Sequence, residues 1–219
     1  MKIYAINGSP RHTGNTSILL QHALDGAASN GAETELIHLT DLQFSGCKSC
    51  FACKLNHAPS YGKCAIQDEL TPVLEKLLAS DGIIFGTPIY FGGETGMFRN
   101  LIERLYFANF RYDPAHSSLI TRKIRTAFVY TMNVSQEGAE QHHYAERLRM
   151  LRAFGGHLFN SGEPPVLFAY NTKQFDDYSK YDATLFDPED KCRSREVQFP
   201  IDCRNAFLMG KAMAEAVIK

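Results

Sequence analysis

The sequence predicts one α/β domain built on a doubly wound, parallel sheet of five strands with helices on both faces. Three observations lead to this fold class. Apolar, β-rich runs alternate along the chain with amphipathic helical patterns, an order that gives parallel strands joined by right-handed crossovers. The run 82–86 is almost wholly apolar, as in a central strand that is covered on both faces. Turn residues follow the first strand directly, and a helical pattern follows them.

The first half of the chain accounts for three strands and two helices. Residues 2–7 are apolar and end at a Gly-Ser-Pro turn, which predicts the first strand. A helical pattern over 15–28 ends at an Asn-Gly pair typical of a C-cap, and 35–39 is the second strand. Asp68 can cap a second helix, whose apolar side chains recur at helical spacing before the third strand at 82–86. These side chains are Leu70, Val73, Leu74, Leu77 and Leu78.

The second half is predicted to contain two more strands and three helices. The expected ranges are 95–107, 140–154 and 204–218 for the helices, and 126–131 and 166–170 for the strands. The pair Gly155-Gly156 is expected to end the middle helix. The stretch from Asn171 to Pro200 mixes charged and aromatic residues and suggests a flap or a dimer arm.

The strand order is predicted to be 2-1-3-4-5, one of the common orders of doubly wound sheets. Residues 1–219 are expected to form a single domain, with a Cys-rich loop at about 44–66 and an elaborated C-terminal segment at about 171–219. In such a sheet, ligands bind beyond the carboxyl ends of the strands. The loops that follow strands one, three and four are therefore expected to hold the functional residues.

The composition limits which classes of partner, such as nucleic acids or membranes, are expected. Hydrophobic residues make up 44% and charged residues 21% of the 219 residues, close to the averages of soluble globular proteins. The formal net charge is -1, so we expect no nucleic acid and no anionic membrane as a partner. No apolar run is long enough to cross a bilayer, and the N-terminal residues have the pattern of a strand rather than of a signal peptide. We therefore expect a cytoplasmic protein.

The loop between the first strand and the first helix has the composition of a phosphate site. It is rich in hydroxyl groups, holds two glycines and one fixed cation, and leads into a helix N-terminus. Such donors, positive charge and the free N–H groups of a first helical turn bind a phosphate monoester. The loop matches neither G-x-G-x-x-G nor a Walker loop, which disfavours ordinary dinucleotide binding and P-loop hydrolysis. The candidate phosphate residues are Ser9, Arg11, Asn15, Thr16 and Ser17.

The loop after the third strand suits a flat aromatic ring system. It offers two adjacent aromatic side chains, backbone N–H groups and flexible glycines. A tricyclic flavin ring needs an apolar or aromatic wall and backbone donors along its polar edge, where the reduced ring carries negative charge. The candidate ring residues are Pro88, Ile89, Tyr90, Phe91 and Gly92. The loop 131–135 after the fourth strand is expected to lie beside the same ring.

At these loops the sequence resembles a known family. The segments 8–16 (GSPRHTGNT) and 81–92 (DGIIFGTPIYFG) are similar to those of the NADPH-dependent FMN reductase and iron–sulfur flavoprotein group. The resemblance covers about the first 130 residues well and the remainder loosely. It implies a flavodoxin-like fold, one bound FMN near a subunit interface, and assembly as a homodimer or homotetramer. It also implies that the candidate phosphate residues hold the FMN phosphate and that the loop 88–92 holds its ring.

The residues and the resemblance together predict an FMN-dependent NAD(P)H oxidoreductase. NAD(P)H is expected to deliver a hydride to bound FMN, which then passes electrons to a small acceptor such as free flavin or a quinone. No side chain is expected to act as acid or base, because the cofactor carries the chemistry. The alternative is an iron–sulfur flavoprotein that acts as an electron carrier and exchanges electrons with a ferredoxin-like protein.

Four of the six cysteines crowd into one stretch with the density of an iron–sulfur ligand set. They are Cys47, Cys50, Cys53 and Cys64, in the spacing C-x2-C-x2-C-x10-C. Tetrahedral thiolate sites also suit zinc, and a group of free thiols is a third interpretation. The family resemblance favours a [4Fe–4S] cluster, although the gap between the last two cysteines is longer here than in cluster-bearing relatives. Cys192 and Cys203 are isolated and are expected to be structural.

Overall fold

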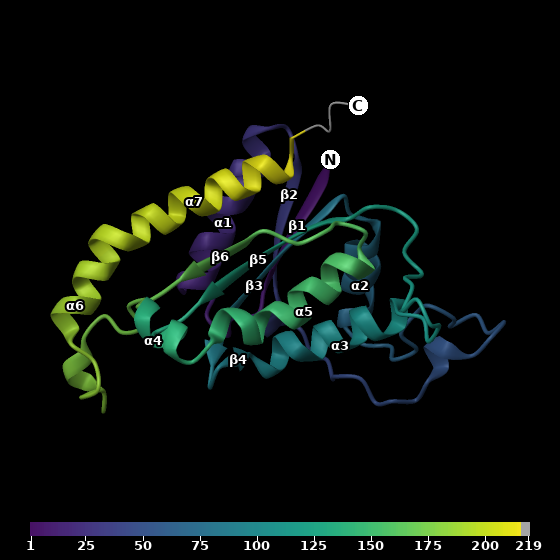
Figure 1. Ribbon diagram of the computed structural model, residues 1–219, viewed down its shortest axis with the longest axis horizontal. Helices are drawn as coiled ribbons and strands as arrows, with labels where there is room; N and C mark the ends of the chain where they lie inside the picture. The colour runs from purple at the N-terminus through teal and green to yellow at the C-terminus, as the bar shows by residue number, and fades with distance from the viewer. Residues whose placement is uncertain (216–219) are drawn as a thin grey trace.

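The computed structural model describes residues 1–215, and its core is a twisted sheet of parallel strands between two layers of helices (Figure 1). The parallel strands are β1 (Lys2–Asn7), β2 (Glu33–His38), β3 (Gly82–Tyr90), β5 (Arg125–Thr131) and β6 (Val166–Ala169). They pair in the order β2-β1-β3-β5-β6, which confirms the predicted order of the five parallel strands. A short strand that the sequence pattern does not predict, β4 (Gly93–Glu94), pairs antiparallel with the end of β3.

Helices cover both faces of the sheet, as predicted (Figure 1). One face packs against α1 (Asn15–Ser29) and α7 (Phe199–Met213), and the other against α2 (Leu70–Ala79), α3 (Gly96–Asn109) and α5 (Tyr144–Leu158). Successive side chains of the central strand β3 pack alternately into the cores on the two faces of the sheet. Ile84 belongs to the core under α1 and α7, whereas Phe85 belongs to the core under α2, α3 and α5. This two-sided burial explains why the strand is almost wholly apolar.

Strand β3 extends beyond the apolar run 82–86, because it continues as the first arm of a hairpin. Phe91 and Gly92 connect it to β4, and both have positive φ angles, 52° and 80°. Two left-handed residues in succession form the tight turn that suits a two-residue hairpin. Tyr90 pairs with Gly93 across the turn. The hairpin therefore continues the chain past the carboxyl edge of the parallel sheet.

The glycine pair Gly155-Gly156 does not end a helix, so this prediction is wrong. Helix α5 continues through both residues. The chain breaks at His143 instead, whose φ of 54° separates α5 from the short α4 (Gln136–Gln141). Close packing requires the glycines: a Cβ atom at Gly155 would lie 2.1 Å from the hydroxyl oxygen of Tyr106. Their function is therefore contact with a neighbouring element, which the local sequence does not reveal.

The last helical run begins earlier than predicted. Helix α6 (Pro188–Arg193) leads through one π-helical turn (Ser194–Gln198) directly into α7, so the helical residues are continuous from 188 to 213. The Asp187 side chain caps this run by accepting the N–H of Glu189, and proline is well tolerated at the first helical position. Residues 216–218 of the predicted helix lie outside the described residues.

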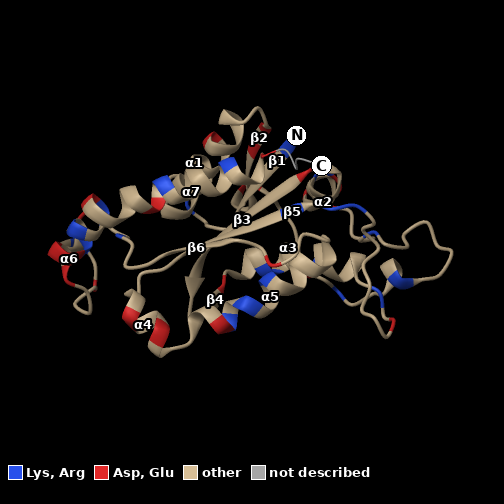
Figure 2. Cartoon of the chain, turned by 45° about the horizontal axis from the view of Figure 1, so that its top comes forward, with Lys and Arg blue, Asp and Glu red and all other residues tan. Residues whose placement is uncertain are grey.

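The irregular stretch is accordingly shorter than the predicted range 171–200. It spans residues 170–187, holds one 3-10 turn at Tyr178–Lys180, and is called the strap segment below. Acidic and basic residues are interspersed along α5, α6 and α7 (Figure 2). Within residues 1–215, no helix combines the length and the apolarity that crossing a bilayer requires.

Candidate functional site

Three loops meet at the carboxyl edge of the sheet. They are the phosphate loop (8–14) after β1, the hairpin turn (91–92) after β3, and the loop 132–135 after β5. The hydroxyl of Thr95, the N-cap of α3, donates to the Gly8 carbonyl at 2.8 Å, which ties the hairpin to the phosphate loop. The hydroxyl oxygens of Thr16 and Thr131 are 2.8 Å apart and join α1 to the end of β5. The elements around the three loops are thus in direct contact.

The side chains of the phosphate loop hold it in shape. The buried Asn7 accepts the N–H of Ser9 through Oδ1 at 3.0 Å, and the Ser9 hydroxyl accepts the N–H of Arg11 at 3.1 Å. The Gly8 N–H donates to the Gly86 carbonyl at 2.7 Å. Because these bonds fix the backbone of the loop, a ligand that binds there loses little affinity to the ordering of the protein.

A histidine on the neighbouring strand supports Asn7. The Asn7 side-chain nitrogen donates to Nδ1 of His38 at 2.9 Å, a bond that requires the neutral imidazole. Burial lowers the pKa of His38 below its ordinary value, and the nearby His12 lowers it further, while Asp41 opposes both. His12 itself pairs with Asp41 at 2.9 Å. The environment of His38 therefore favours the neutral imidazole, which accepts the hydrogen bond from Asn7.

The strap segment lies over the first turn of α1. Arg11 Nη1 donates to the Gln174 carbonyl at 2.8 Å, and Asn15 Nδ2 donates to the Lys173 carbonyl at 2.9 Å. From the π-helical turn, Arg195 Nη1 donates to Asn15 Oδ1 at 3.1 Å. Two of the predicted phosphate residues are thus joined to chain segments that follow the last strand.

A groove of about 490 Å³ opens beside this contact. Three cationic side chains line it, those of Arg11, Lys173 and Arg195. The groove adjoins the N-terminus of α1, where the N-cap Gly14 contributes no side-chain hydrogen bond. Positive charge beside the free N–H groups of a first helical turn attracts an anion. The other lining residues are His12, Thr13, Asn15, Ile18, Gln174, Phe175 and Asp176.

The predicted phosphate residues separate into two groups. Arg11 and Asn15 line the groove, whereas Ser9, Thr16 and Ser17 are buried and are not among its lining residues. The hydroxyls of Ser9 and Thr16 are engaged within the protein, so in this structure they shape the loop.

Sequence reasoning missed two cationic residues of the groove. Lys173 carries a usable signal, because it lies just past the carboxyl end of the last strand, where ligands of doubly wound sheets bind. Arg195 lies in the π-helical turn between α6 and α7 and has no comparable signal.

The tip of the hairpin exposes two aromatic side chains. Tyr90 is 47% exposed and Phe91 is 108% exposed. The left-handed conformation of Phe91 is uncommon for a bulky residue, and such conformations concentrate at functional sites. The other predicted ring residues, Pro88 and Ile89, are half-buried at the base of the hairpin, and Gly92 completes its turn. The hairpin can therefore present an aromatic surface beside the phosphate loop.

The loop after β5 contains a buried acceptor. Asn133 Oδ1 has no hydrogen-bond partner among the described residues, whereas its Nδ2 donates to Gln174 Oε1 at 3.1 Å. Lys191 Nζ donates to the Asn133 carbonyl at 2.7 Å, and burial lowers the pKa of Lys191 to about 8. A buried oxygen without a partner is costly, so it marks a place where a ligand or water donor completes the bonding.

The four clustered cysteines border one small cavity of about 20 Å³, which has room for about one water molecule. Ser49 and Phe51 have positive φ angles of 53° and 57°, so the chain curls tightly on either side of Cys50. The Ser49 N–H donates to Cys47 Sγ at 3.4 Å. Among residues 1–215, no three side chains of His, Cys, Asp or Glu are arranged to hold a metal ion. The sequence-predicted ligand set thus shares one location but is not assembled around an ion.

A buried arginine anchors the cysteine loop to α3. Arg104 is 1% exposed and donates through Nε to Cys64 Sγ at 3.3 Å and through Nη1 to the Asp68 carboxylate at 2.5 Å. Burial alone would raise the pKa of Asp68, but the hydrogen bond and the charge of Arg104 outweigh it and lower the pKa. Burial raises the pKa of the Cys53 thiol. Arg104 therefore fixes the position of one cysteine from the helix side.

The doubly wound sheet, with its loops gathered at the carboxyl edge, defines a flavodoxin-like α/β protein. The sequence profile of the family described as NADPH-dependent FMN reductase matches residues 1–164. The chain belongs to this family, which confirms the resemblance seen in the segments 8–16 and 81–92.

Curated relatives match about half of the chain's length. An iron–sulfur flavoprotein of Methanocaldococcus jannaschii is 42% identical over 104 residues, 48% of this chain and 51% of the relative. An iron–sulfur flavoprotein of Archaeoglobus fulgidus is 43% identical over 104 residues, 48% of each chain. The chain spans about half the length of the curated relatives that it matches.

Solved structures share the fold at low identity. An NAD(P)H:quinone oxidoreductase from Methanothermobacter marburgensis superposes with a TM-score of 0.69 at 15% identity, covering 99% of this chain and 98% of the other. An FMN-dependent NADH-azoreductase from Bacillus anthracis, solved with FMN, superposes with a TM-score of 0.66 at 10% identity, covering 98% and 99%. At these identities the likeness establishes the fold.

Proposed function

We propose that this chain is an FMN-dependent NAD(P)H oxidoreductase that passes electrons to a small acceptor, a flavin or a quinone. The observation that carries the proposal is the groove at the N-terminus of α1, where Arg11, Lys173 and Arg195 lie beside a helix end without a side-chain cap. A phosphate monoester suits this groove in charge and in hydrogen bonding. Membership of the FMN reductase family supports the same cofactor.

The residues present fit the phosphate end of FMN. Arg11, Asn15 and the N–H groups of the first turn of α1 would hold the phosphate, and Lys173 and Arg195 would add positive charge. Arg11 and Asn15 donate to carbonyls of the strap segment. A phosphate would accept hydrogen bonds from the same two donors in place of these neutral carbonyls. Because the phosphate is charged, such hydrogen bonds are stronger than neutral ones.

The residues present also fit the ring end. The exposed aromatics Tyr90 and Phe91 would cover a face of the ring, and the unpaired Asn133 Oδ1 would accept a hydrogen bond from the ligand. FMN, when bound, supplies the hydride chemistry. The chain would supply position and electrostatics, and no side chain is assigned as a catalytic acid or base.

We also propose that the chain assembles as a homodimer or homotetramer. Phe91 stands fully exposed at the hairpin tip, with Tyr90 half-exposed beside it. A second copy that packs against the hairpin would remove this apolar surface from water.

A second candidate function is that of an iron–sulfur flavoprotein that carries electrons to a ferredoxin-like protein. The supporting observation is that Cys47, Cys50, Cys53 and Cys64 border one cavity. Four thiolates are the usual ligands of an iron–sulfur cluster, and backbone N–H bonds to sulfur tune such clusters. The cavity is smaller than a cluster, so the cysteine loop would have to widen to hold one.

Anaerobic reduction of the purified protein tests the first candidate. NADPH alone is expected to bleach the flavin absorption within one catalytic turnover, and a quinone is expected to restore it. The second candidate is tested by measuring the iron and acid-labile sulfide content of the purified protein. Cys53→Ser is expected to abolish this content, and Cys192→Ser is expected to leave it unchanged. A protein that contains iron and sulfide, and whose flavin NADPH does not reduce, contradicts the first proposal and supports the second.

A further inference from the structure

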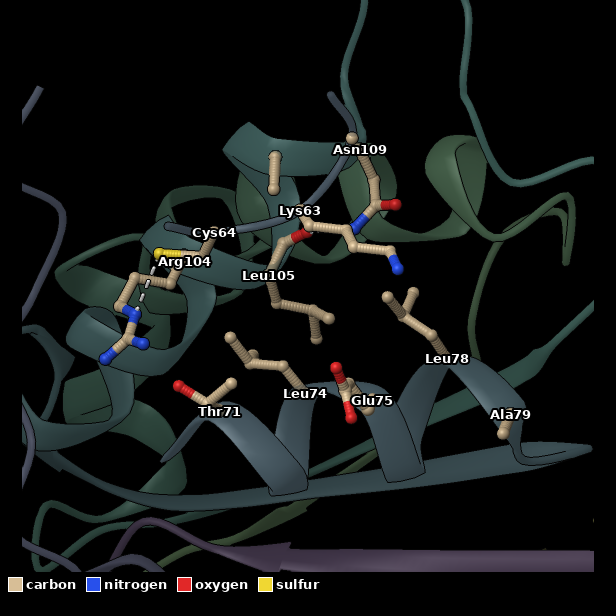
Figure 3. A pocket seen from close by; sticks show the side chains of 12 residues that line it. Lys63, Cys64, Thr71, Leu74, Glu75, Leu78, Ala79, Arg104, Leu105 and Asn109 are labelled. Atoms are coloured by element: carbon tan, nitrogen blue, oxygen red, sulfur yellow. Dashed lines mark hydrogen bonds between the residues drawn. The ribbon is translucent and has the colours of Figure 1, made fainter. Parts of the chain in front are cut away.

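A second, apolar cavity lies between α2 and α3, on the side of the molecule that carries the cysteine loop. Its volume is about 340 Å³, at the lower end of the range for small-molecule sites. Leu74, Leu78 and Leu105 form its floor, with Lys63 above them (Figure 3). A cavity of this size and lining suits a ligand of one or two fused rings.

The mouth of this cavity carries one charge of each sign. Lys63 and Glu75 are both exposed lining residues, one from the cysteine loop and one from α2. Figure 3 shows Lys63 extending across the cavity with its ammonium group near Leu78. The two charges offer a hydrogen-bond donor and an acceptor and cancel each other, while the third charged lining residue, Arg104, is paired with Asp68. They therefore favour a neutral ligand with an oxygen at its edge over an anion or a cation.

The apolar cavity and the cysteine cavity share a wall. Cys64, Arg104 and Ala108 line both of them. Cys64 Sγ accepts from Arg104 Nε at 3.3 Å, and this pair stands at one end of the apolar cavity (Figure 3). Arg104 is in turn held by its hydrogen bond to Asp68. A ligand on the leucine floor would therefore lie beside the wall that separates it from the other three cysteines.

We propose that this cavity binds a small, neutral, oxygen-bearing aromatic molecule of the quinone class. Its ring lies on Leu74, Leu78 and Leu105, its oxygen accepts from Lys63, and its edge faces Cys64. The choice of an electron-accepting ring rests on the proposed function, whereas the binding itself rests on the cavity alone. The site is distinct from the flavin groove, which lies at the N-terminus of α1.

Equilibrium dialysis tests this site with 2,3-dimethyl-1,4-naphthoquinone, whose substituted ring positions prevent addition of thiols. The protein is used as purified, without NAD(P)H, so that only binding is measured. Leu78→Trp fills the cavity and is expected to weaken binding at least about ten-fold, since a blocked pocket loses most of its apolar contact. Glu75→Phe, at an exposed helix position, covers the mouth and is expected to have the same effect. Met150→Trp, at an exposed position of α5, is the matched control and should bind as the parent does.

Each outcome bears on the proposal. Binding by the parent and by Met150→Trp, with loss in Leu78→Trp and Glu75→Phe, supports it. Absence of binding by the parent, or equal binding by all four proteins, overturns it. Dialysis is repeated after removal of the flavin: binding that disappears with the flavin places the quinone on the flavin and also overturns the proposal. Flavin content is measured separately, so a failure of the proposed function is distinguishable from a failure of this site.

Discussion

At the scale of the residue, Asn7 and His38 hold the phosphate loop in shape, although neither is among the candidate phosphate residues predicted from the sequence. Asn7 was not singled out from the sequence, because an asparagine at a strand end is unremarkable by itself. The structure gives it two roles: it accepts the Ser9 N–H within the phosphate loop and donates to His38 on the next strand. The pairing of β1 with β2 places Asn7 opposite His38, and this register is not apparent from either residue alone.

The Asn7–His38 bond predicts a dependence of stability on pH. The pKa of His38 is lowered in the folded protein, so the unfolded chain binds this proton more readily than the folded one. The stabilising contribution is therefore complete above the unfolded pKa of about 6.5 and is lost as the pH falls toward the lower folded pKa. As the pH falls through this window, we expect the free energy of unfolding of the parent to decrease by about 1 kcal/mol more than that of His38→Asn. This is the net contribution of one hydrogen bond.

Urea unfolding of the parent and of His38→Asn at pH 7.5 and pH 5.5 measures this difference, and His22→Asn, on α1, serves as the control substitution. An equal change in unfolding free energy for the parent and His38→Asn between the two pH values would contradict the neutral His38 that the phosphate loop requires.

At the scale of the element, two glycines let α1 and α7 touch. A Cβ atom at Gly26 would lie 1.9 Å from the Phe207 carbonyl oxygen, and one at Gly210 would lie 1.7 Å from the Ala23 carbonyl oxygen. Both neighbours are backbone atoms, which cannot move aside without shifting a whole helix. This crossing positions the helical run that brings Arg195 to Asn15, the first residue of α1.

Gly210→Ala is therefore expected to destabilise the protein by about 1–3 kcal/mol, the usual cost of overpacking. Gly96→Ala is the matched comparison, because a Cβ atom at Gly96 meets nothing within 4 Å. That substitution is expected to be neutral or stabilising by up to about 1 kcal/mol, since alanine restricts the unfolded chain. Thermal unfolding monitored by circular dichroism gives both values, and a Gly210→Ala protein as stable as Gly96→Ala would refute the close crossing.

The regular elements follow from local sequence patterns. The errors at Gly155-Gly156 and at the hairpin to β4 arise where local propensity does not determine the backbone. The leucine stripe of α2 and the apolar run of β3 are local signals, and both elements are present. Gly155-Gly156 was assigned to a helix end because glycine weakens a helix locally, whereas contact with Tyr106 is a tertiary reason for it. The hairpin to β4 was missed because Phe91 is a poor turn residue by propensity, and it adopts a left-handed φ.

At the scale of the whole molecule, topology predicts where the site lies but not everything that it contains. The rule that ligands bind beyond the carboxyl ends of parallel strands selects three loops from the sequence, and these loops lie together at the carboxyl edge of the sheet. Lys173 could have been suspected from its place just past the last strand, but the proximity of Arg195 to Arg11 depends on the path of the helical run and has no local signal. The cysteines were grouped from spacing alone, and the structure places them around one cavity.

The proposed function requires recognition of a phosphate group at the N-terminus of α1. The most direct measurement is a fluorescence titration of FMN and of riboflavin, which lacks the phosphate, against the parent, Arg11→Ala and the exposed α5 control Arg149→Ala. Each charge-assisted hydrogen bond contributes about 1.5–3 kcal/mol, and the phosphate would receive at least two, from Arg11 and Asn15. The parent and the control should therefore bind FMN at least about 100-fold more tightly than riboflavin. Arg11→Ala should lose about ten-fold or more of that preference. Equal affinity of the parent for the two flavins, or an unchanged preference in Arg11→Ala, would contradict the account.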